Sequence, residues 1–259
     1  MPKTQINGIN MYYEIHGSGY PLIMMTGFTG TTRMWDSQIA ALSKEYQLII
    51  FDMRGHGQTE APRDHTSYSN DILVEDEYQL LQHLGINKAI IGGLSLGGLV
   101  GMWFYLKHPE MTRALVLADT GPGYRNPETR KAFAKDREKL TELLIKDGME
   151  AFLRSKYSVD DYYTTPDIMR TLDPIGIAFI NKGVLTDVPP VPLEEIKGPP
   201  TLIICGEQDA SMMPASHVMS NRIQGSELVI IPQAGHGANV DQPLLFNQAI
   251  LDFLKRQNL

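Results

Sequence analysis

The chain has 259 residues, of which 42% are hydrophobic and 20% charged, and its formal net charge is -7. Nucleic acid is excluded as a partner, because binding to phosphates requires clustered Lys and Arg, and this acidic chain has no such cluster. A single cysteine, Cys205, rules out an intramolecular disulfide, and without a secretion signal or a long apolar run we expect a cytoplasmic protein with no membrane segment.

The predicted strands are short, and most of them alternate with helical patterns along the chain. Residues 4–7 and 11–16 alternate polar and apolar side chains, as the strands of a half-buried hairpin do. Six continuously apolar runs follow, at residues 22–25, 48–51, 89–91, 114–117, 202–205 and 228–231. The helical patterns between them cover residues 35–42, 70–84, 96–107, 215–223 and 244–255. Strands buried on both faces and separated by helices indicate an α/β protein with a mostly parallel, eight-stranded sheet flanked by helices.

This alternation breaks once, between residues 121 and 200. The segment is helical and more polar, and it closes with an extended, proline-rich linker at residues 188–192. We interpret residues 122–199 as a helical cap with a return linker, inserted into a core domain made of residues 1–121 and 200–259. Such a cap would lie over the carboxyl ends of the strands, where an open α/β sheet binds its ligand. The alternative is a helical excursion packed against the side of the sheet.

The strongest local motif is Gly-Leu-Ser-Leu-Gly at residues 93–97, which follows an apolar strand and opens a helix. This is the context of a nucleophile elbow, in which a strained turn exposes the hydroxyl of the central Ser95. Such a turn needs glycine on both sides of the serine, because larger side chains would collide with the adjacent strand and helix. The alternative interpretation is an ordinary glycine-rich turn between a strand and a helix.

A serine hydroxyl needs a base within hydrogen-bond reach and a carboxylate that orients the base. His236 stands between two glycines after the last predicted strand, and Asp209 follows the strand that ends at Cys205. Both loops lie beyond the carboxyl ends of strands, so the side chains can converge on Ser95. A second candidate for the acid is Asp119, which follows the sixth strand, although it also suits a turn that caps a backbone N–H.

The oxyanion that forms during attack on an ester must meet preorganised donors. We expect one from the backbone N–H of Leu96, the residue after the nucleophile, and another from Phe28 in the loop Thr-Gly-Phe-Thr-Gly at residues 26–30. Taken alone, this loop is also compatible with a flexible glycine-rich linker. His56, in the turn at residues 52–57, is expected to brace the site rather than to catalyse.

Together these motifs give the chain a family resemblance over nearly its whole length. The loop 26–35, the Asp-x-Arg-Gly-x-Gly turn at residues 52–57, the elbow at Ser95, Gly206-x-x-Asp209 and Gly235-His236 occur in order. The sequence resembles the α/β-hydrolase superfamily and, within it, small serine carboxylesterases and 3-oxoadipate enol-lactonase-like enzymes. The resemblance implies the α/β-hydrolase fold, a catalytic triad and a cap over the pocket. The chain departs from the family at Thr26, where histidine is common.

From these residues we expect a serine hydrolase that cleaves a small carboxylic ester or lactone through an acyl-enzyme intermediate. Ser rather than Asp at position 95 argues against epoxide hydrolases and haloalkane dehalogenases, whose covalent intermediate needs a carboxylate nucleophile. The alternatives are a carbon–carbon bond hydrolase or a cofactor-free perhydrolase with the same triad, and a ligand receptor that retains the triad with little turnover. The sequence leaves open whether copies of the chain form a homo-oligomer.

The substrate pocket is expected to be apolar. Its candidate lining residues are Met24, Met212, Met213, Phe152, Tyr157 and Phe179. We expect no cofactor and no metal, because the chain has neither paired cysteines nor a His-Glu-x-x-His pattern.

Overall fold

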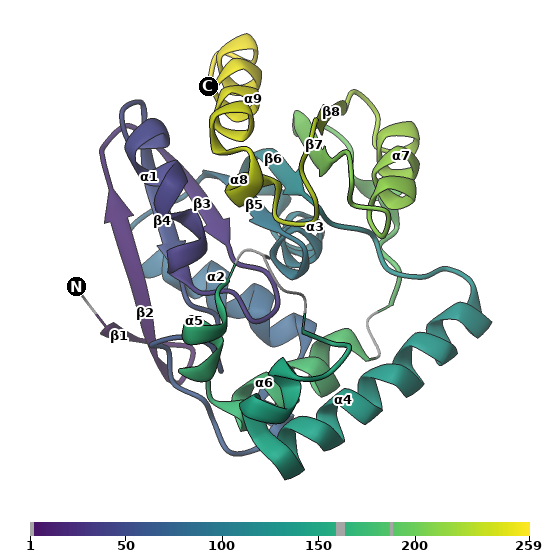
Figure 1. Cartoon of the computed structure of the whole chain (residues 1–259). Helices are drawn as coiled ribbons and strands as arrows, with labels where there is room; N and C mark the ends of the chain where they lie inside the picture. The colour runs from purple at the N-terminus through teal and green to yellow at the C-terminus, as the bar shows by residue number, and fades with distance from the viewer. Residues whose placement is uncertain (1–2, 159–163, 187–188) are drawn as a thin grey trace.

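A computed structural model describes residues 3–158, 164–186 and 189–259 of the chain (Figure 1). Its centre is one eight-stranded sheet with the order β1-β2-β4-β3-β5-β6-β7-β8. The strands are β1 (Lys3–Ile6), β2 (Ile9–His16), β3 (Tyr20–Met25), β4 (Tyr46–Phe51), β5 (Ala89–Leu94), β6 (Thr112–Ala118), β7 (Thr201–Gly206) and β8 (Glu227–Ile231). β2 pairs antiparallel with both β1 and β4, and all other neighbours are parallel. The predicted mostly parallel sheet is confirmed.

Helices cover both faces of this sheet. The larger ones in the core are α1 (Asp36–Leu42), α2 (Asn70–His83), α3 (Leu96–Lys107), α7 (Met213–Arg222) and α9 (Pro243–Arg256). Shorter elements are η1 (Thr32–Trp35), η2 (His65–Ser67), η3 (Pro109–Met111), η5 (Leu193–Glu195) and α8 (Ala238–Asp241). None of the helices in the described part of the chain is both long and apolar enough to cross a membrane.

Two apolar cores lie on opposite faces of the sheet, because successive side chains of a strand point to opposite sides. On one face, side chains of the sheet pack with Trp35 and with Phe246 of α9. On the other face they pack with helices α2, α3 and α7, for example through Leu80 and Phe104. This alternation explains why the inner strands read as continuous apolar runs.

The segment between β6 and β7 is helical, as expected. It contains α4 (Pro127–Leu153), α5 (Pro166–Arg170), α6 (Pro174–Ile180) and the π-helical turn η4 (Asn181–Leu185). Figure 1 shows α4 and α6 together at the side of the molecule toward which the arrow of β3 points. These helices share an apolar cluster of their own, which includes Leu144, Phe152 and Ile177. The division into a core and a separate cap domain stays a prediction.

α4 is the longest helix in the described part of the chain, with 27 residues. Asn126 caps its first turn by accepting hydrogen bonds from the N–H groups of Glu128 and Thr129 at 2.9 and 3.0 Å. The helix then continues to Leu153 across a break at Gly148, whose φ of 73° is one that glycine adopts without strain. The predicted return linker, residues 188–192, begins at residue 188, which lies outside the described residues. From Val191 the returning chain contacts the outgoing one, since its N–H donates to the carbonyl of Pro122 at 2.8 Å.

Candidate active site

Ser95 stands at the sharp turn between β5 and α3. Its φ of 55° and ψ of -112° are a strained conformation for a residue with a side chain, of the kind that concentrates at functional sites. The flanking glycines make the turn possible. A Cβ at Gly93 would collide with the backbone of Gly97, and a Cβ at Gly97 would collide with the carbonyl groups of Met25 and Thr26. The elbow predicted from the sequence is therefore present in the structure.

His236 and Asp209 meet Ser95 from two other loops. The Nε2 atom of His236 lies 2.9 Å from Ser95 Oγ, and its Nδ1 atom lies 2.6 Å from Oδ2 of Asp209. An ionised carboxylate only accepts hydrogen bonds, so Nδ1–H is the donor to Asp209 and Nε2 is left to accept from the serine hydroxyl. The side chains of His236 and Asp209 are 11% and 2% exposed. The three candidates thus form one continuous chain of hydrogen bonds.

The loop after β7 holds the carboxylate of Asp209 in place. Its Oδ1 accepts hydrogen bonds from Ser211 Oγ at 2.6 Å and from the N–H groups of Ser211 and Met212 at 3.1 Å each. This leaves Oδ2 directed at His236. The contribution of Ser211 was not predicted from the sequence, although a serine two residues after an aspartate is a common turn arrangement.

Asp119, the second candidate for the acid, has a different role. It is fully buried after β6, and its Oδ1 accepts from the N–H of Gly206 at 2.8 Å. Its Oδ2 accepts from the N–H of Ala238 at 3.1 Å. Burial raises the pKa of Asp119 well above its ordinary value. The structure therefore pairs Asp209 with the imidazole and uses Asp119 to join the loop of Asp209 to the loop of His236.

His56 braces the loop after β3, which carries Phe28. Burial lowers the pKa of His56 to about 4, so the ring is neutral, and its Nε2 accepts from the N–H of Thr29 at 3.1 Å. The ring of His56 also packs edge-on against that of Phe28, with their centres 6.2 Å apart. Thr29 itself has a φ of 65°, so the loop is bent sharply at this point.

Leu96, the other expected oxyanion donor, is the first residue of α3. The first N–H groups of a helix have no partner within the helix, and the helix dipole favours negative charge there. Phe28 and Leu96 both line the cavity that contains Ser95 and His236. The arrangement can present two backbone donors to a negatively charged oxygen.

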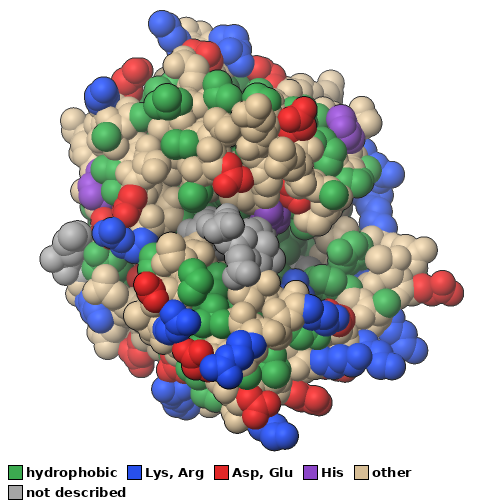
Figure 2. Space-filling view, viewed as in Figure 1, with side chains coloured by type: hydrophobic (Ala, Val, Ile, Leu, Met, Phe, Trp, Pro, Cys, Tyr) green, Lys and Arg blue, Asp and Glu red, His purple; other side chains and the backbone are tan. Residues whose placement is uncertain are grey.

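The cavity above Ser95 has a volume of about 840 Å³. Phe152, Tyr157 and Met212 line it, as the sequence suggested. Figure 2 shows the surface hollowed near its centre, with hydrophobic and basic side chains at the margin. The cavity is large enough for a small organic ester. Its lining residues come from loops that follow strands of the sheet and from α4.

Three of the expected pocket residues do not line this cavity. Met24 is fully buried in the apolar core on the α1 and α9 face of the sheet, because its position on β3 directs it there. Met213 follows Met212 at the start of α7, and neighbouring positions of a helix point about 100° apart. Phe179 packs against Tyr68, with ring centres 5.6 Å apart. In each case the direction of the side chain, which sequence alone does not give, decides the outcome.

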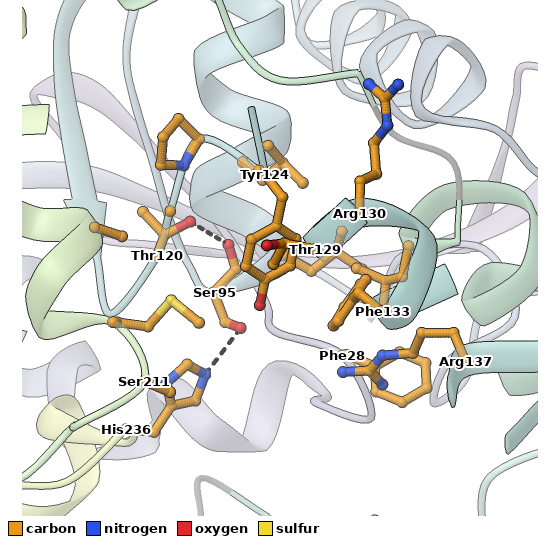
Figure 3. Close-up of a pocket in the computed structure, with 18 of the residues that line it drawn as sticks. Phe28, Ser95, Thr120, Tyr124, Thr129, Arg130, Phe133, Arg137, Ser211 and His236 are labelled. Carbon is orange, nitrogen blue, oxygen red and sulfur yellow. Dashed lines mark hydrogen bonds between the residues drawn. The ribbon is translucent and has the colours of Figure 1, made fainter. Parts of the chain in front are cut away.

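Residues of α4 that were not predicted from the sequence also line the cavity. Figure 3 shows Thr129, Arg130, Phe133 and Arg137 of α4 on one side of the pocket, with Ser95 and His236 on the other. The spacing of residues 130, 133 and 137 places them on one face of a helix. That spacing was visible in the sequence, but a charged helix face is usually directed to solvent.

Asp119, Cys205 and Asp209 bring their side-chain oxygen and sulfur atoms within 4.8 Å of one another. Such a cluster could in principle ligate a metal ion. Both carboxylates are already engaged by backbone N–H groups, and burial raises the pKa of the Cys205 thiol to about 12, so it stays protonated. A protonated thiol is a poor metal ligand. We assign no metal to this cluster.

Known proteins resemble this chain in sequence and structure. A family model described as alpha/beta hydrolase fold matches residues 20–159. A putative 2-succinyl-6-hydroxy-2,4-cyclohexadiene-1-carboxylate synthase of Bacillus subtilis is 31% identical over 90% of this chain and 89% of its own length. A thermophilic esterase of Thermogutta terrifontis has a TM-score of 0.84 and 26% identity, covering 96% of this chain and 94% of its own. An enol-lactonase of Burkholderia xenovorans has the same TM-score and identity, covering 98% and 100%.

Proposed function

The chain belongs to the alpha/beta hydrolase fold family, and within it we propose that this protein is a serine hydrolase that cleaves a small carboxylic ester or lactone. The observation that carries the proposal is the chain of contacts from Ser95 through His236 to Asp209, with heavy-atom distances of 2.9 and 2.6 Å. An esterase and an enol-lactonase among the solved structures that it resembles support the choice of substrate class.

In the proposed reaction, Ser95 Oγ attacks the acyl carbon while His236 Nε2 takes the serine proton. The electron pair of the carbonyl double bond moves to its oxygen. When this pair returns, the bond to the leaving alcohol oxygen breaks and His236 gives its proton to that oxygen. Water then attacks the acyl-serine with His236 as base, which releases the acid and returns the proton to Ser95.

The charge on the tetrahedral oxygen would be stabilised by the N–H groups of Phe28 and Leu96. His56 supports this role, because its bond to Thr29 N–H fixes the loop that carries Phe28 before substrate arrives. Preorganised donors of this kind cost no reorganisation during the reaction. Removing one typically lowers turnover by about a hundred- to a thousandfold.

We further propose that residues 122–199 act as a cap that helps to form the substrate pocket. The support is the lining of the cavity, to which α4 contributes Phe133 and Arg137 opposite Ser95. Holding the ester between α4 and the elbow would limit the entry of water.

A second candidate is the reaction of the Bacillus subtilis relative, which is a putative carboxylate synthase rather than a hydrolase. Its 31% identity over most of both chains is the observation that favours this candidate. The two functions differ in substrate, so direct assays separate them.

The experiment is a panel of esters of increasing acyl length, assayed beside simple lactones and the substrate of the synthase, with wild type and Ser95→Ala. We expect hydrolysis of at least one ester or lactone, with at least about a thousandfold lower turnover in Ser95→Ala. An organophosphonate should label Ser95 alone, as mass spectrometry of peptides would report. Undiminished hydrolysis in a folded Ser95→Ala, or labelling of another serine, would reject the mechanism.

A further inference from the structure

The loop after β6 holds the backbone of Ser95 on both sides. The N–H of Ser95 donates to the carbonyl of Ala118, the last residue of β6, at 2.9 Å. Two residues later, the Oγ1 hydroxyl of Thr120 donates to the carbonyl oxygen of Ser95 at 2.6 Å. The same oxygen accepts from the N–H of Leu99, in the first turn of α3, at 3.1 Å. A side chain outside the elbow therefore contacts the backbone of the nucleophile.

Thr120 itself is held firmly. Its side chain is buried, and it fills the space that the absence of a Cβ at Gly98 leaves open. A Cβ at Gly98 would lie 2.6 Å from Cγ2 of Thr120 and 2.8 Å from its Cβ, which is closer than carbon atoms pack. The preceding residue, Asp119, is anchored by the N–H groups of Gly206 and Ala238. The hydroxyl of Thr120 therefore donates from a fixed position.

The bond to the Ser95 carbonyl also controls the next N–H group. The carbonyl of Ser95 and the N–H of Leu96 belong to one peptide group, which is planar and trans, so its oxygen and its hydrogen point in opposite directions. The φ and ψ of Ser95 lie outside the regions that most residues with a side chain adopt, so the backbone alone does not favour this orientation. Holding the oxygen therefore fixes the direction of the Leu96 N–H.

The placement of Thr120 fits this role. Figure 3 shows its hydroxyl bonded to the Ser95 carbonyl on one side of Ser95, with Phe28 on the other side. Phe28 carries the second expected oxyanion donor, and Phe28 and Leu96 both line the cavity. A peptide group whose oxygen is held by Thr120 directs its N–H away from Thr120.

We propose that Thr120 is a positioning residue, which holds the Ser95 carbonyl and thereby aims the Leu96 N–H at the oxyanion. This inference rests on the proposed function, because it concerns the same site. Thr120 acts through the peptide group and transfers no proton. A donor that is aimed before the substrate arrives needs no reorganisation when charge develops on the carbonyl oxygen of the substrate.

The test removes the hydroxyl and then restores it. Thr120→Val keeps the shape of the side chain without the hydroxyl, Thr120→Ala removes the hydroxyl without adding a methyl group beside the carbonyl, and Thr120→Ser keeps the hydroxyl. The matched control is Thr112→Val. Thr112 is buried at the other end of β6, and its hydroxyl donates to the carbonyl of His108 at 3.3 Å. Circular dichroism and thermal unfolding check the fold of each variant.

We expect Thr120→Val and Thr120→Ala to lower kcat by about ten- to a hundredfold and to change KM by less than about threefold, because an oxyanion donor acts mainly in the transition state. Thr120→Ser should stay within about fivefold of wild type, and Thr112→Val should keep the kcat of wild type. An unchanged kcat in the variants without the hydroxyl would overturn the proposal. So would an equal loss in Thr120→Ser, which would assign the effect to packing.

A transition-state analogue gives a second measure. A trifluoromethyl ketone with the acyl chain of the best ester accepts Ser95 Oγ at its carbonyl carbon while His236 takes the proton, which leaves an oxyanion between the donors. In Thr120→Val its inhibition constant should rise in parallel with the fall in kcat/KM. The corresponding trifluoromethyl alcohol cannot form the adduct, so its inhibition constant should not change. Equal shifts for both compounds would contradict a role at the oxyanion.

Crystal structures separate this proposal from the hydrolase proposal, because they need no turnover. The peptide group between Ser95 and Leu96 should be rotated in Thr120→Val and should keep its wild-type orientation in Thr120→Ser. An unchanged peptide group in Thr120→Val overturns the role of Thr120, even if kcat falls. If the group rotates while wild type cleaves no ester or lactone, the positioning role stands and the hydrolase proposal fails.

Discussion

The carboxyl groups of Asp119 and Asp209 each have an oxygen within 4.8 Å of the other group, and Oδ2 of Asp209 lies 2.6 Å from Nδ1 of His236. Asp119 accepts hydrogen bonds from two backbone N–H groups: that of Gly206, in the loop of Asp209, and that of Ala238, in the loop of His236. The two carboxylates therefore have separate tasks: one orients the base, and the other joins the loops that carry the base and the acid. Substitutions that keep the shape of each side chain can separate these tasks.

Asp209→Asn should lower turnover by about ten-thousandfold with little loss of stability. The amide cannot stabilise the imidazolium, and it favours the wrong tautomer of His236. Steady-state kinetics with the best ester of the panel measures the loss, and thermal unfolding reports the stability. Near-normal turnover in this variant would remove Asp209 from the proposed triad.

Asp119→Asn should mainly reduce stability. The amide nitrogen cannot accept a hydrogen bond, so the N–H of either Gly206 or Ala238 loses its buried partner, at a cost of about 1–3 kcal/mol. Urea unfolding measures this cost, and turnover of the folded fraction should stay far above that of Asp209→Asn. If Asp119→Asn abolishes turnover while the protein remains folded, the sixth strand carries the acid after all.

Activity should fall only at distinctly acidic pH. Burial lowers the pKa of His236 from its ordinary 6.5 to about 4, so the base is neutral at and above neutral pH. Because only neutral imidazole accepts the serine proton, kcat/KM should rise with pH through a midpoint below 6.5 and then level off. The assay uses a neutral ester, so that no group of the substrate titrates over the same pH range. A midpoint above about 7 would contradict the burial of the base.

Glu77, on α2, should make the protein less stable as pH rises toward neutrality. It is fully buried, neither carboxyl oxygen has a hydrogen-bond partner among the described residues, and burial raises its pKa from 4.5 to about 8. The folded chain therefore holds a proton that the unfolded chain releases above pH 4.5. Its stabilising effect is complete below 4.5 and is lost as pH rises through about 8, by up to about 1.4 kcal/mol per pH unit.

Glu77→Gln tests this effect, because the amide has nearly the same shape and does not titrate. Urea unfolding across this pH range should show a flatter dependence of the free energy of unfolding than in wild type. Glu75→Gln, two residues earlier and partly exposed, is the matched control. An identical pH dependence in wild type and Glu77→Gln would show that the carboxyl is solvated.

The sequence by itself determined the fold and the identity of the elbow. Apolar runs alternating with helical patterns gave the order of strands and helices, because burial on both faces of a parallel sheet demands continuous apolar residues. The glycines around Ser95 were informative for a steric reason: a Cβ at Gly93 would meet the backbone of Gly97 in the same turn, and a Cβ at Gly97 would meet the backbone at the end of the neighbouring strand β3. Such constraints act over short distances and leave a motif.

Only the tertiary structure decided which side chains meet. Asp119 and Asp209 have similar places after neighbouring strands, and their different partners follow from how the loops of residues 206 and 238 pack around them. Met24 points to the core and Arg137 to the cavity because strand direction and helix packing fix their orientation. Contacts between segments far apart in the chain depend on rigid-body placement of whole elements, which residue types and spacing do not specify.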